Sequence, residues 1–232
     1  MNRVLGKLYI ISTPIGNLGD ITYRAIDTLK NVDYLLSEDT RETDKILKKY
    51  AIKKSQIPYT DQKHEKLYLK ILNDLKNGKN IALLTDSGTP LVSDPGFKLV
   101  NQLTKEGINI ISIPGSTAFV SAMTVSGLPL DKIVFIGFLP KTKSKRENIL
   151  NEYGNLDATL ILYESSHRIK GLLEEIHNIL GDRIICVAKD LTKKFENVQT
   201  NSISCFIENG HLIKEKGEFV VLVAKKDFTL DE

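Results

Sequence analysis

Residues 81–107 constrain the fold of this chain more than any other segment. They open with the apolar run IALL (residues 81–84), which predicts a buried strand, and they close with apolar residues at helical spacing. The connecting loop, TDSGTPLVSDPG (residues 85–96), contains Asp94 and Pro95, which are typical of an N-cap and a first helical residue. Its two glycines, two prolines and two aspartates exceed what a plain connector needs. Because glycine allows close backbone approach and helix-start amides receive anions, the loop predicts part of a ligand site.

The first 113 residues alternate between strand and helix patterns. The apolar runs that predict strands are residues 8–11, 32–36, 57–59, 81–84 and 108–113. This β-α alternation predicts a mostly parallel sheet covered by helices, with right-handed crossovers.

A second α/β domain is predicted from about residue 116, where the pattern changes. Four further apolar runs predict strands at residues 133–138, 159–163, 184–188 and 219–224. The clearest helical stripe of the chain is expected to begin at Ser166 and to end at Gly181. We therefore expect an N-terminal domain over residues 1–115 and a C-terminal domain over residues 116–232.

The unusual polar segments all follow strands of the first domain. They are residues 13–17, 38–41, 60–61, 85–96 and 114–116. In an open parallel sheet these are the carboxyl ends of the strands, where ligands bind. The alternative interpretation is that loops are polar in any protein. We favour a ligand site because all five segments are expected to meet at one edge.

Composition excludes several classes of protein. A net charge of +3 over 232 residues does not indicate a nucleic-acid binder by bulk charge, although a local basic patch is compatible with it. No run of eighteen apolar residues predicts a membrane span, and the first residues lack the apolar core of a signal peptide.

The four histidines show no metal-ligand spacing, so no metal is expected. The two cysteines, Cys186 and Cys205, are expected to be buried thiols in a reducing, cytoplasmic compartment.

The ligand class can be narrowed from the loops at the carboxyl edge. No G-x-G-x-x-G or P-loop motif occurs, which disfavours a dinucleotide and a P-loop nucleotide. Arg41 is the main cation among these loops, whereas a triphosphate would need more positive charge. A ligand with an adenosine, a carboxylate and a cationic centre suits the edge better. S-adenosylmethionine is such a molecule, and the residues permit it without singling it out.

An ordered series of motifs from residue 8 to residue 225 resembles a known family. The motifs that resemble the tetrapyrrole-methylase superfamily are TPIGNLGD (13–20), EDTR (38–41), DSGTP (86–90), SDPG (93–96) and PG (114–115). Those that resemble its bacterial branch that 2'-O-methylates a cytidine of small-subunit ribosomal RNA are GFLP (137–140), YESSHR (163–168), LTKKFE (191–196) and KGEF (216–219). The chain departs from the family pattern at Ser116 and Ser166, where proline is usual, and at Lys189 and Asp190, where Arg-Glu is usual.

The resemblance implies a fold, a methyl donor and a substrate. It implies two α/β domains, the second with a mixed sheet, and S-adenosylmethionine in the cleft that the C-terminal domain completes. It implies no metal, a homodimer, and 16S ribosomal RNA as the substrate, within the 30S subunit. The residues expected at the donor are Pro14, Gly16, Asp86, Ser87, Gly88, Thr89, Pro90, Asp94, Pro114, Gly115 and Ser116. For a single glycine or proline of this set, the alternative is that it only shapes a turn.

The resemblance also suggests substrate contacts and proton acceptors. The residues expected to contact RNA are Arg41, Lys143, Lys145, Arg146 and Arg168. The candidates to remove the hydroxyl proton are Glu164, His167 and Asp86, in that order.

Local interpretations of the same residues stay open. Arg41 could pair with Asp39 at a helix start, residues 141–146 could be a solvated loop, and residues 163–168 could be a solvated helix turn. Tyr153 and Phe195 are expected to be packing residues rather than platforms for bases.

Two other functions are compatible with parts of the sequence. One is methylation of a tetrapyrrole or another small molecule, against which the basic segment and residues 163–168 argue. The other is a non-enzymatic ribosome-binding factor, against which the intact loop of residues 86–96 argues.

Overall fold

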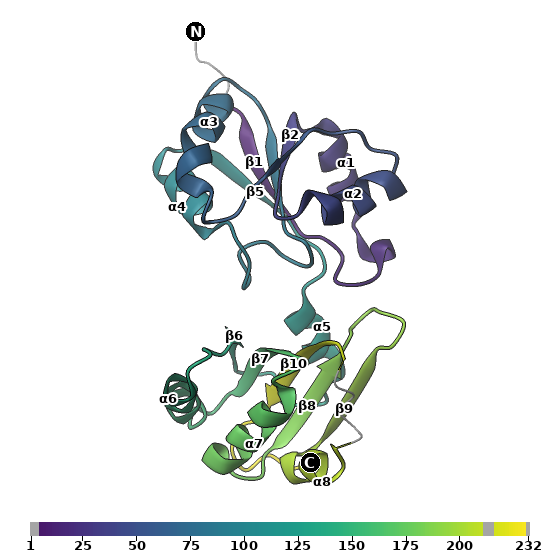
Figure 1. The fold of residues 1–232 in the computed structure, drawn as a ribbon, viewed down its shortest axis with the longest axis vertical. Coiled ribbons are helices and arrows are strands. Elements are labelled where there is room, and N and C mark those ends of the chain that lie inside the picture. Colours follow the sequence, from purple (N-terminus) through teal and green to yellow (C-terminus); the bar gives the residue numbers. More distant parts are fainter. Residues whose placement is uncertain (1–4, 211–215, 231–232) are drawn as a thin grey trace. The chain divides into compact units, whose positions relative to one another are not determined.

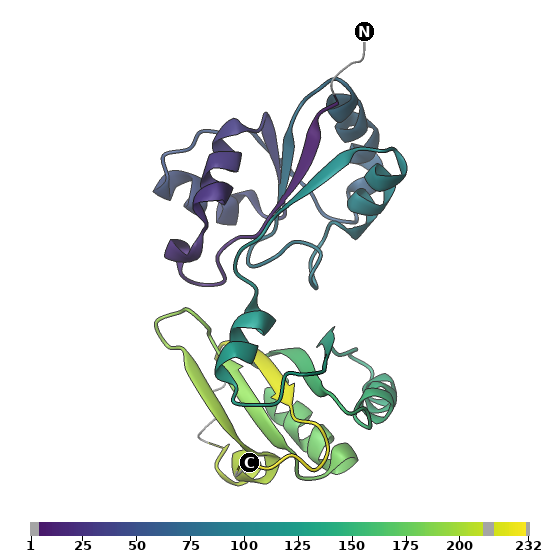
Figure 2. The same cartoon turned by 180° about the vertical axis from the view of Figure 1, so that it is seen from behind.

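The chain divides into two compact α/β units in a computed structural model that describes residues 5–210 and 216–230. The units are Met1–Thr117 and Ala118–Glu232 (Figures 1 and 2). Each unit has one sheet of its own, in agreement with the expected fold class of two α/β domains.

The sheet of the first unit is parallel throughout. Its strands lie in the order β3-β2-β4-β1-β5. Their bounds are β1 Lys7–Ile11, β2 Tyr34–Ser37, β3 Gln56–Pro58, β4 Ile81–Leu84 and β5 Asn109–Ile113. Tyr9 of β1 lies opposite Ala82 on one side and Ile111 on the other, which fixes the register of the three central strands. All four residues of β2 and of β4 are buried, as continuous apolar runs in a doubly covered sheet should be.

Two pairs of helices cover this sheet (Figure 1). Helices α1 (Tyr23–Asn31) and α2 (Thr40–Lys49) pack on the face that presents Ile11, Leu35 and Leu84. Helices α3 (His64–Lys76) and α4 (Phe97–Lys105) pack on the other face, and a short 3-10 helix spans Leu18–Asp20. Because the helices alternate with parallel strands, every strand-to-helix loop lies at the carboxyl edge of the sheet.

The sheet of the second unit is mixed, with the order β6-β7-β10-β8-β9. Its strands are β6 Ile133–Phe138, β7 Thr159–Ser165, β8 Ile184–Lys189, β9 Asn197–Ser202 and β10 Glu218–Val223. Strands β6 and β7 pair in parallel, and the other pairings are antiparallel. Helices α6 (Lys143–Tyr153), α7 (Ile169–Leu180) and α8 (Ile203–Glu208) build the core on one face, and α5 (Ala118–Val125) packs against β7 and β10.

Several sequence predictions need correction. Helix α4 begins at Phe97 and not at Pro95, because Gly96 and not Asp94 takes the N-cap position, with a φ of 129° that glycine adopts readily. The stripe expected from Ser166 begins as helix only at Ile169. The charged segment of residues 141–146, which could have been a solvated loop, is helical from Lys143 onward, where α6 begins.

The structure confirms some of the predictions about which cysteine and aromatic side chains are buried, and it contradicts others. Cys186 is buried, whereas Cys205 is only partly buried. Tyr153 packs against the core of the second unit as expected. The packing role expected for Phe195 is wrong, because 71% of this residue is exposed and its ring has Lys194 Nζ 5.5 Å from the centroid.

Candidate functional site at the carboxyl edge of the first sheet

The loops that follow β1 and β4 are joined by backbone hydrogen bonds. The N–H of Thr13 donates to the carbonyl of Gly88 at 2.8 Å, and the N–H of Gly88 donates back to Thr13 at 3.2 Å. Gly88 has a φ of 83°, a conformation that suits glycine. The predicted donor residues after these two strands are therefore brought together at one edge.

A chain of hydroxyl groups extends the junction to the loop after β5. The Oγ of Ser12 lies 2.9 Å from the Oγ1 of Thr89, which in turn lies 2.7 Å from the Oγ1 of Thr117. Thr89 also contacts the carbonyl of Ser116 at 3.2 Å. Nothing in the sequence pattern singled out Ser12 or Thr117, since isolated hydroxyls occur in most loops.

Gly115 lies where the first and fifth strands leave the sheet. A Cβ atom added to it would lie 3.0 Å from the Cβ of Ser12 and 3.4 Å from the carbonyl oxygen of Ser12. Such distances are tighter than most Cβ contacts, so glycine favours the close approach of the two chain segments here. Pro114 and Gly115 are both exposed, which leaves this backbone accessible to a ligand.

Three carboxyl groups gather around the ends of β2 and β4. The Oδ1 of Asp86 accepts the N–H of Asp39 at 2.9 Å, and the Oε2 of Glu38 lies 3.4 Å from the N–H of Asp86. Partial burial of their carboxyl groups raises the pKa of Glu38 and of Asp86, and neighbouring carboxylates raise both further. The pKa of Asp94 rises to about 7, chiefly through burial and then through the charges of Glu38 and Asp86. The edge is thus acidic and suited to a ligand that carries hydroxyl groups or a cation.

The loop of residues 85–96 has a strained backbone. Leu91 and Ser93 have φ values of 72° and 63°, which residues other than glycine rarely adopt. The loop is held at its end by Asp61, whose Oδ1 accepts the N–H of Gly96 at 3.1 Å. The expectation that the start of α4 offers free amides to an anion is therefore modified, because a carboxylate of the chain already occupies one of them. Such backbone outliers are frequent at ligand sites.

Arg41 lies in the first turn of α2 and forms the local ion pair with Asp39 that the sequence analysis gave as an alternative. The side chain of Asp39 caps the helix by accepting the N–H of Arg41 at 2.8 Å, and its Oδ1 lies 3.0 Å from the Nε of Arg41. These bonds hold the pKa of Asp39 down at about 2. The Arg41 side chain is 86% exposed, so the pair does not shield its guanidinium from solvent.

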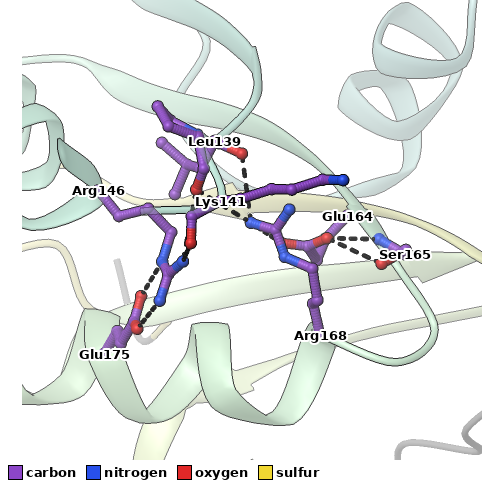
Figure 3. Close-up of polar contacts among 8 residues, drawn as sticks. Leu139, Lys141, Arg146, Glu164, Ser165, Arg168 and Glu175 are labelled. Atoms are coloured by element: carbon purple, nitrogen blue, oxygen red, sulfur yellow. Dashed lines mark hydrogen bonds and ion pairs between the residues drawn. The ribbon is translucent and has the colours of Figure 1, made fainter. Parts of the chain in front are cut away.

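In the second unit, two arginines and their carboxylate partners hold residues 139–141 (Figure 3). We call Arg146, Glu164, Arg168 and Glu175 the clasp. Arg168 donates through Nη2 to the carbonyl of Leu139 at 3.2 Å and pairs with Glu164 at the same distance. Arg146 donates to the carbonyl of Lys141 at 2.6 Å and forms a two-point pair with Glu175, whose pKa it lowers. Two of the three arginines expected to contact RNA, Arg146 and Arg168, thus hold a loop in place.

The candidate proton acceptors differ sharply in access. Glu164 is 2% exposed, and its Oε1 accepts the N–H and the hydroxyl of Ser165 at 2.7 and 3.1 Å. His167 is exposed on the turn between β7 and α7, and Asp86 is exposed at the edge of the first sheet. Lys143 and Lys145 are exposed in the first turn of α6.

Neither a metal cluster nor a membrane helix is found in the part of the chain that the structure describes. No group of three or more His, Cys, Asp or Glu side chains among the described residues could hold a metal ion. His211 lies outside the described residues. No helix within residues 5–210 and 216–230 is long and apolar enough to cross a bilayer.

The chain thus has joined loops at the edge of a parallel sheet in its first unit and a mixed sheet in its second unit. Residues 7–205 match the family model of the tetrapyrrole (corrin/porphyrin) methylases, and the chain belongs to this family.

The chain is also similar to curated proteins named ribosomal RNA small subunit methyltransferase I. That of Halalkalibacterium halodurans is 42% identical over 218 residues, covering 94% of this chain and 75% of the relative. That of Thermotoga maritima is 40% identical over 223 residues, covering 96% of this chain and 100% of the relative.

Two solved structures share the fold at low identity. A diphthine synthase has a TM-score of 0.72 with 12% identity, covering 97% of this chain and 93% of that one. A uroporphyrin-III C-methyltransferase from Thermus thermophilus, complexed with S-adenyl homocysteine, has a TM-score of 0.64 with 17% identity, covering 94% of this chain and 97% of that one.

Proposed function

We propose that this chain transfers a methyl group from S-adenosylmethionine to the 2'-hydroxyl of a cytidine ribose in 16S ribosomal RNA. The observation that carries the proposal is the junction of the loops after β1, β4 and β5, from Thr13, Gly88 and Thr89 to Gly115. Relatives that are 40% and 42% identical and are named for small-subunit ribosomal RNA methylation support the substrate. We place the protein in the cytoplasm, as a homodimer that acts on RNA within the 30S subunit.

The donor site fits the residues at the carboxyl edge. Exposed backbone at Gly16, Pro114 and Gly115 allows a flat ligand to lie close to the chain. The carboxylates of Glu38 and Asp86 complement ribose hydroxyls and a positive sulfonium. The residues that we assign to the donor site are Pro14, Gly16, Asp86, Ser87, Gly88, Thr89, Pro90, Asp94, Pro114, Gly115 and Ser116.

The donor supplies an activated methyl group. The chain therefore has to bind and orient the two reactants and to accept the hydroxyl proton. The ribose 2'-oxygen forms a bond to the methyl carbon while the carbon–sulfur bond breaks and its electron pair stays on sulfur. Positioning of the two reactants is the main contribution of the protein. The hydroxyl proton passes to His167 or Asp86, which are exposed, rather than to Glu164, whose carboxylate is buried and already bonded. Glu164 then serves to position Arg168.

Methyl transfer to isolated particles tests this function directly. Small subunits from cells that lack the protein would be incubated with the purified chain and methyl-labelled donor, and the modified nucleotide would be mapped. Label on a cytidine 2'-oxygen of 16S RNA is the expected result. Label on a porphyrinoid instead would favour the small-molecule alternative. Donor binding that is absent in calorimetry would favour a non-enzymatic ribosome-binding factor.

A further inference from the structure

Four aromatic rings from α5, β6 and β7 of the second unit form a shelf. Phe119 stacks on Phe135 with centroids 4.4 Å apart, and Phe135 meets the edge of Tyr163 at 5.1 Å. Phe138 lies 5.4 Å from Tyr163, and 57% of this residue is exposed. The N–H of Phe119 donates to the Tyr163 hydroxyl at 3.2 Å, which fixes the shelf to helix α5. We call these four residues the aromatic shelf.

A β-bulge is what brings Phe138 onto the shelf. Side chains three positions apart on a regular strand point to opposite faces of the sheet. The register between β6 and β7 shifts between Phe135 and Gly137, and Gly137 has a φ of 73°. This one-residue shift places Phe135 and Phe138 on the same face, so that both contact Tyr163. Bulges are frequent beside functional sites, where they redirect a side chain.

The segment after Phe138 is held rigidly rather than loosely. Arg168 binds the carbonyl of Leu139, and Arg146 binds the carbonyl of Lys141, as Figure 3 shows. Arg146 is in turn held by Glu175 at two points. The exposed ring therefore adjoins a segment that two arginine side chains hold in place.

The charge beside the shelf indicates the kind of partner. Lys141, Lys143 and Lys145 follow Phe138 within seven residues and are all exposed. An accessible aromatic face next to cations is the arrangement by which proteins hold an unstacked nucleobase and its phosphate. An aliphatic protein or lipid partner would not require the exposed aromatic ring that the bulge places beside Tyr163.

We propose that the aromatic shelf stacks one unpaired nucleobase of the substrate RNA on Phe138, with the lysines of residues 141–145 facing the adjoining phosphates. This inference rests on the proposed function and adds to it a specific contact with the substrate. It assigns to Phe138 a role in RNA binding that is separate from binding of the methyl donor.

The test compares three substitutions of one ring. Phe138→Ala removes the stacking face, Phe138→Leu keeps an apolar side chain without a π face, and Phe138→Tyr keeps the ring. With methyl-labelled donor and small subunits from cells lacking the protein, Phe138→Ala and Phe138→Leu should lower kcat/KM about tenfold to a hundredfold, mainly through KM. Phe138→Tyr should restore most of the activity. Ile207→Ala, at a 41% exposed apolar residue of α8, is the matched control and should leave kcat/KM unchanged.

Each contrary outcome has a distinct meaning. If Phe138→Leu is as active as the native chain, stacking on this ring is excluded. If Phe138→Ala weakens donor binding in calorimetry as much as it lowers kcat/KM, the ring belongs to the donor site and the inference is overturned. If it changes the mass in light scattering, Phe138 touches a second copy of the chain instead, and the inference is again overturned. If the native chain methylates no particle, the proposed function fails first, and the inference that rests on it fails with it.

Discussion

Thr13 and Gly88 exchange both of their backbone hydrogen bonds although they follow two different strands of a parallel sheet. This short antiparallel bridge fixes the loop after β1 against the loop after β4. Ser12, the residue before the bridge, faces Gly115 in the loop after β5. The three loops are therefore coupled so closely that a side chain added at Gly115 would press against Ser12.

Replacing Gly115 by valine should weaken donor binding. The new Cβ would meet Ser12 Cβ at 3.0 Å, so the loop after β5 would have to move away from the edge. We expect the dissociation constant for S-adenosylmethionine to rise about tenfold or more, on the order of 1.4 kcal/mol, in calorimetry. Gly171→Val is the control, because a Cβ at Gly171 meets nothing within 4 Å. Equal donor affinity in the two variants would remove Gly115 from the donor site.

Asp94 should make the first unit less stable as pH rises. Its pKa of about 7 in the folded chain exceeds the ordinary value of 3.8, so the folded chain binds more protons than the unfolded chain between these values. The stabilisation from Asp94 is therefore complete below about pH 4 and is lost as pH rises through about pH 7. Asp94→Asn should remove this dependence.

Denaturant unfolding between pH 4 and pH 8 measures the effect as a difference from the native chain. The difference isolates Asp94 from carboxylates that act in the opposite direction, such as Asp39 with its pKa of about 2. Asp20→Asn, at an exposed carboxylate of the same unit, is the matched control. A difference curve for Asp94→Asn that is flat with pH would show that the Asp94 carboxyl titrates normally.

The sequence predicted the sheet of the first unit and the edge where its polar loops meet. The sheet and the edge both follow from local patterns. A continuous apolar run such as residues 81–84 indicates a strand that is buried on both faces, and the alternation of such strands with helices indicates a parallel sheet. The start of α4 was misplaced because Gly96, and not Asp94, is the N-cap, and Gly96 is held by a contact from far away in the chain. Asp61 supplies the hydrogen bond to Gly96 across 35 positions, and no local pattern at Asp94 and Pro95 reports it.

The second unit was less predictable for similar reasons. Helix α6 opens with lysines that are good helix formers but carry no apolar stripe in the first turn, so the segment resembled a loop. Strand β9 (Asn197–Ser202) is a polar edge strand and gave no apolar run. The aromatic shelf depends on the bulge at Gly137, which only the pairing of β6 with β7 reveals.

Arg146 should matter more for stability than for RNA binding. Its guanidinium holds Glu175 at two points and the carbonyl of Lys141, and both side chains of the pair are less than a fifth exposed, at 17% and 18%. Lysine cannot reproduce this fork, so Arg146→Lys should lower the free energy of unfolding by about 1–3 kcal/mol. Hydrogen exchange should rise around residues 139–141. Lys145→Ala, its exposed neighbour, should change stability by no more than about 0.5 kcal/mol. Equal effects from the two variants would mean that the clasp does not hold the loop.

The exposed lysines of α6 should contribute to RNA affinity without touching the donor site. Replacing Lys143 and Lys145 together by alanine, and leaving Arg146 intact, removes two cations from the surface while keeping the clasp. The affinity for small subunits should fall, and the slope of log K against log salt should flatten by about 0.7–0.9 for each phosphate that these lysines neutralise. Donor affinity should stay unchanged.

The control for this charge change is the pair Lys30→Ala and Lys105→Ala. These exposed lysines lie in the last turns of α1 and α4, which end at the amino edge of the sheet, opposite the candidate site. Both double variants lower the net charge by two, so a bulk electrostatic effect would flatten the salt slope equally in both. A flattening confined to the α6 variant would place RNA phosphates at Lys143 and Lys145. An unaltered slope in that variant would mean that these lysines are only solvated, since counterion release accompanies the neutralisation of every phosphate.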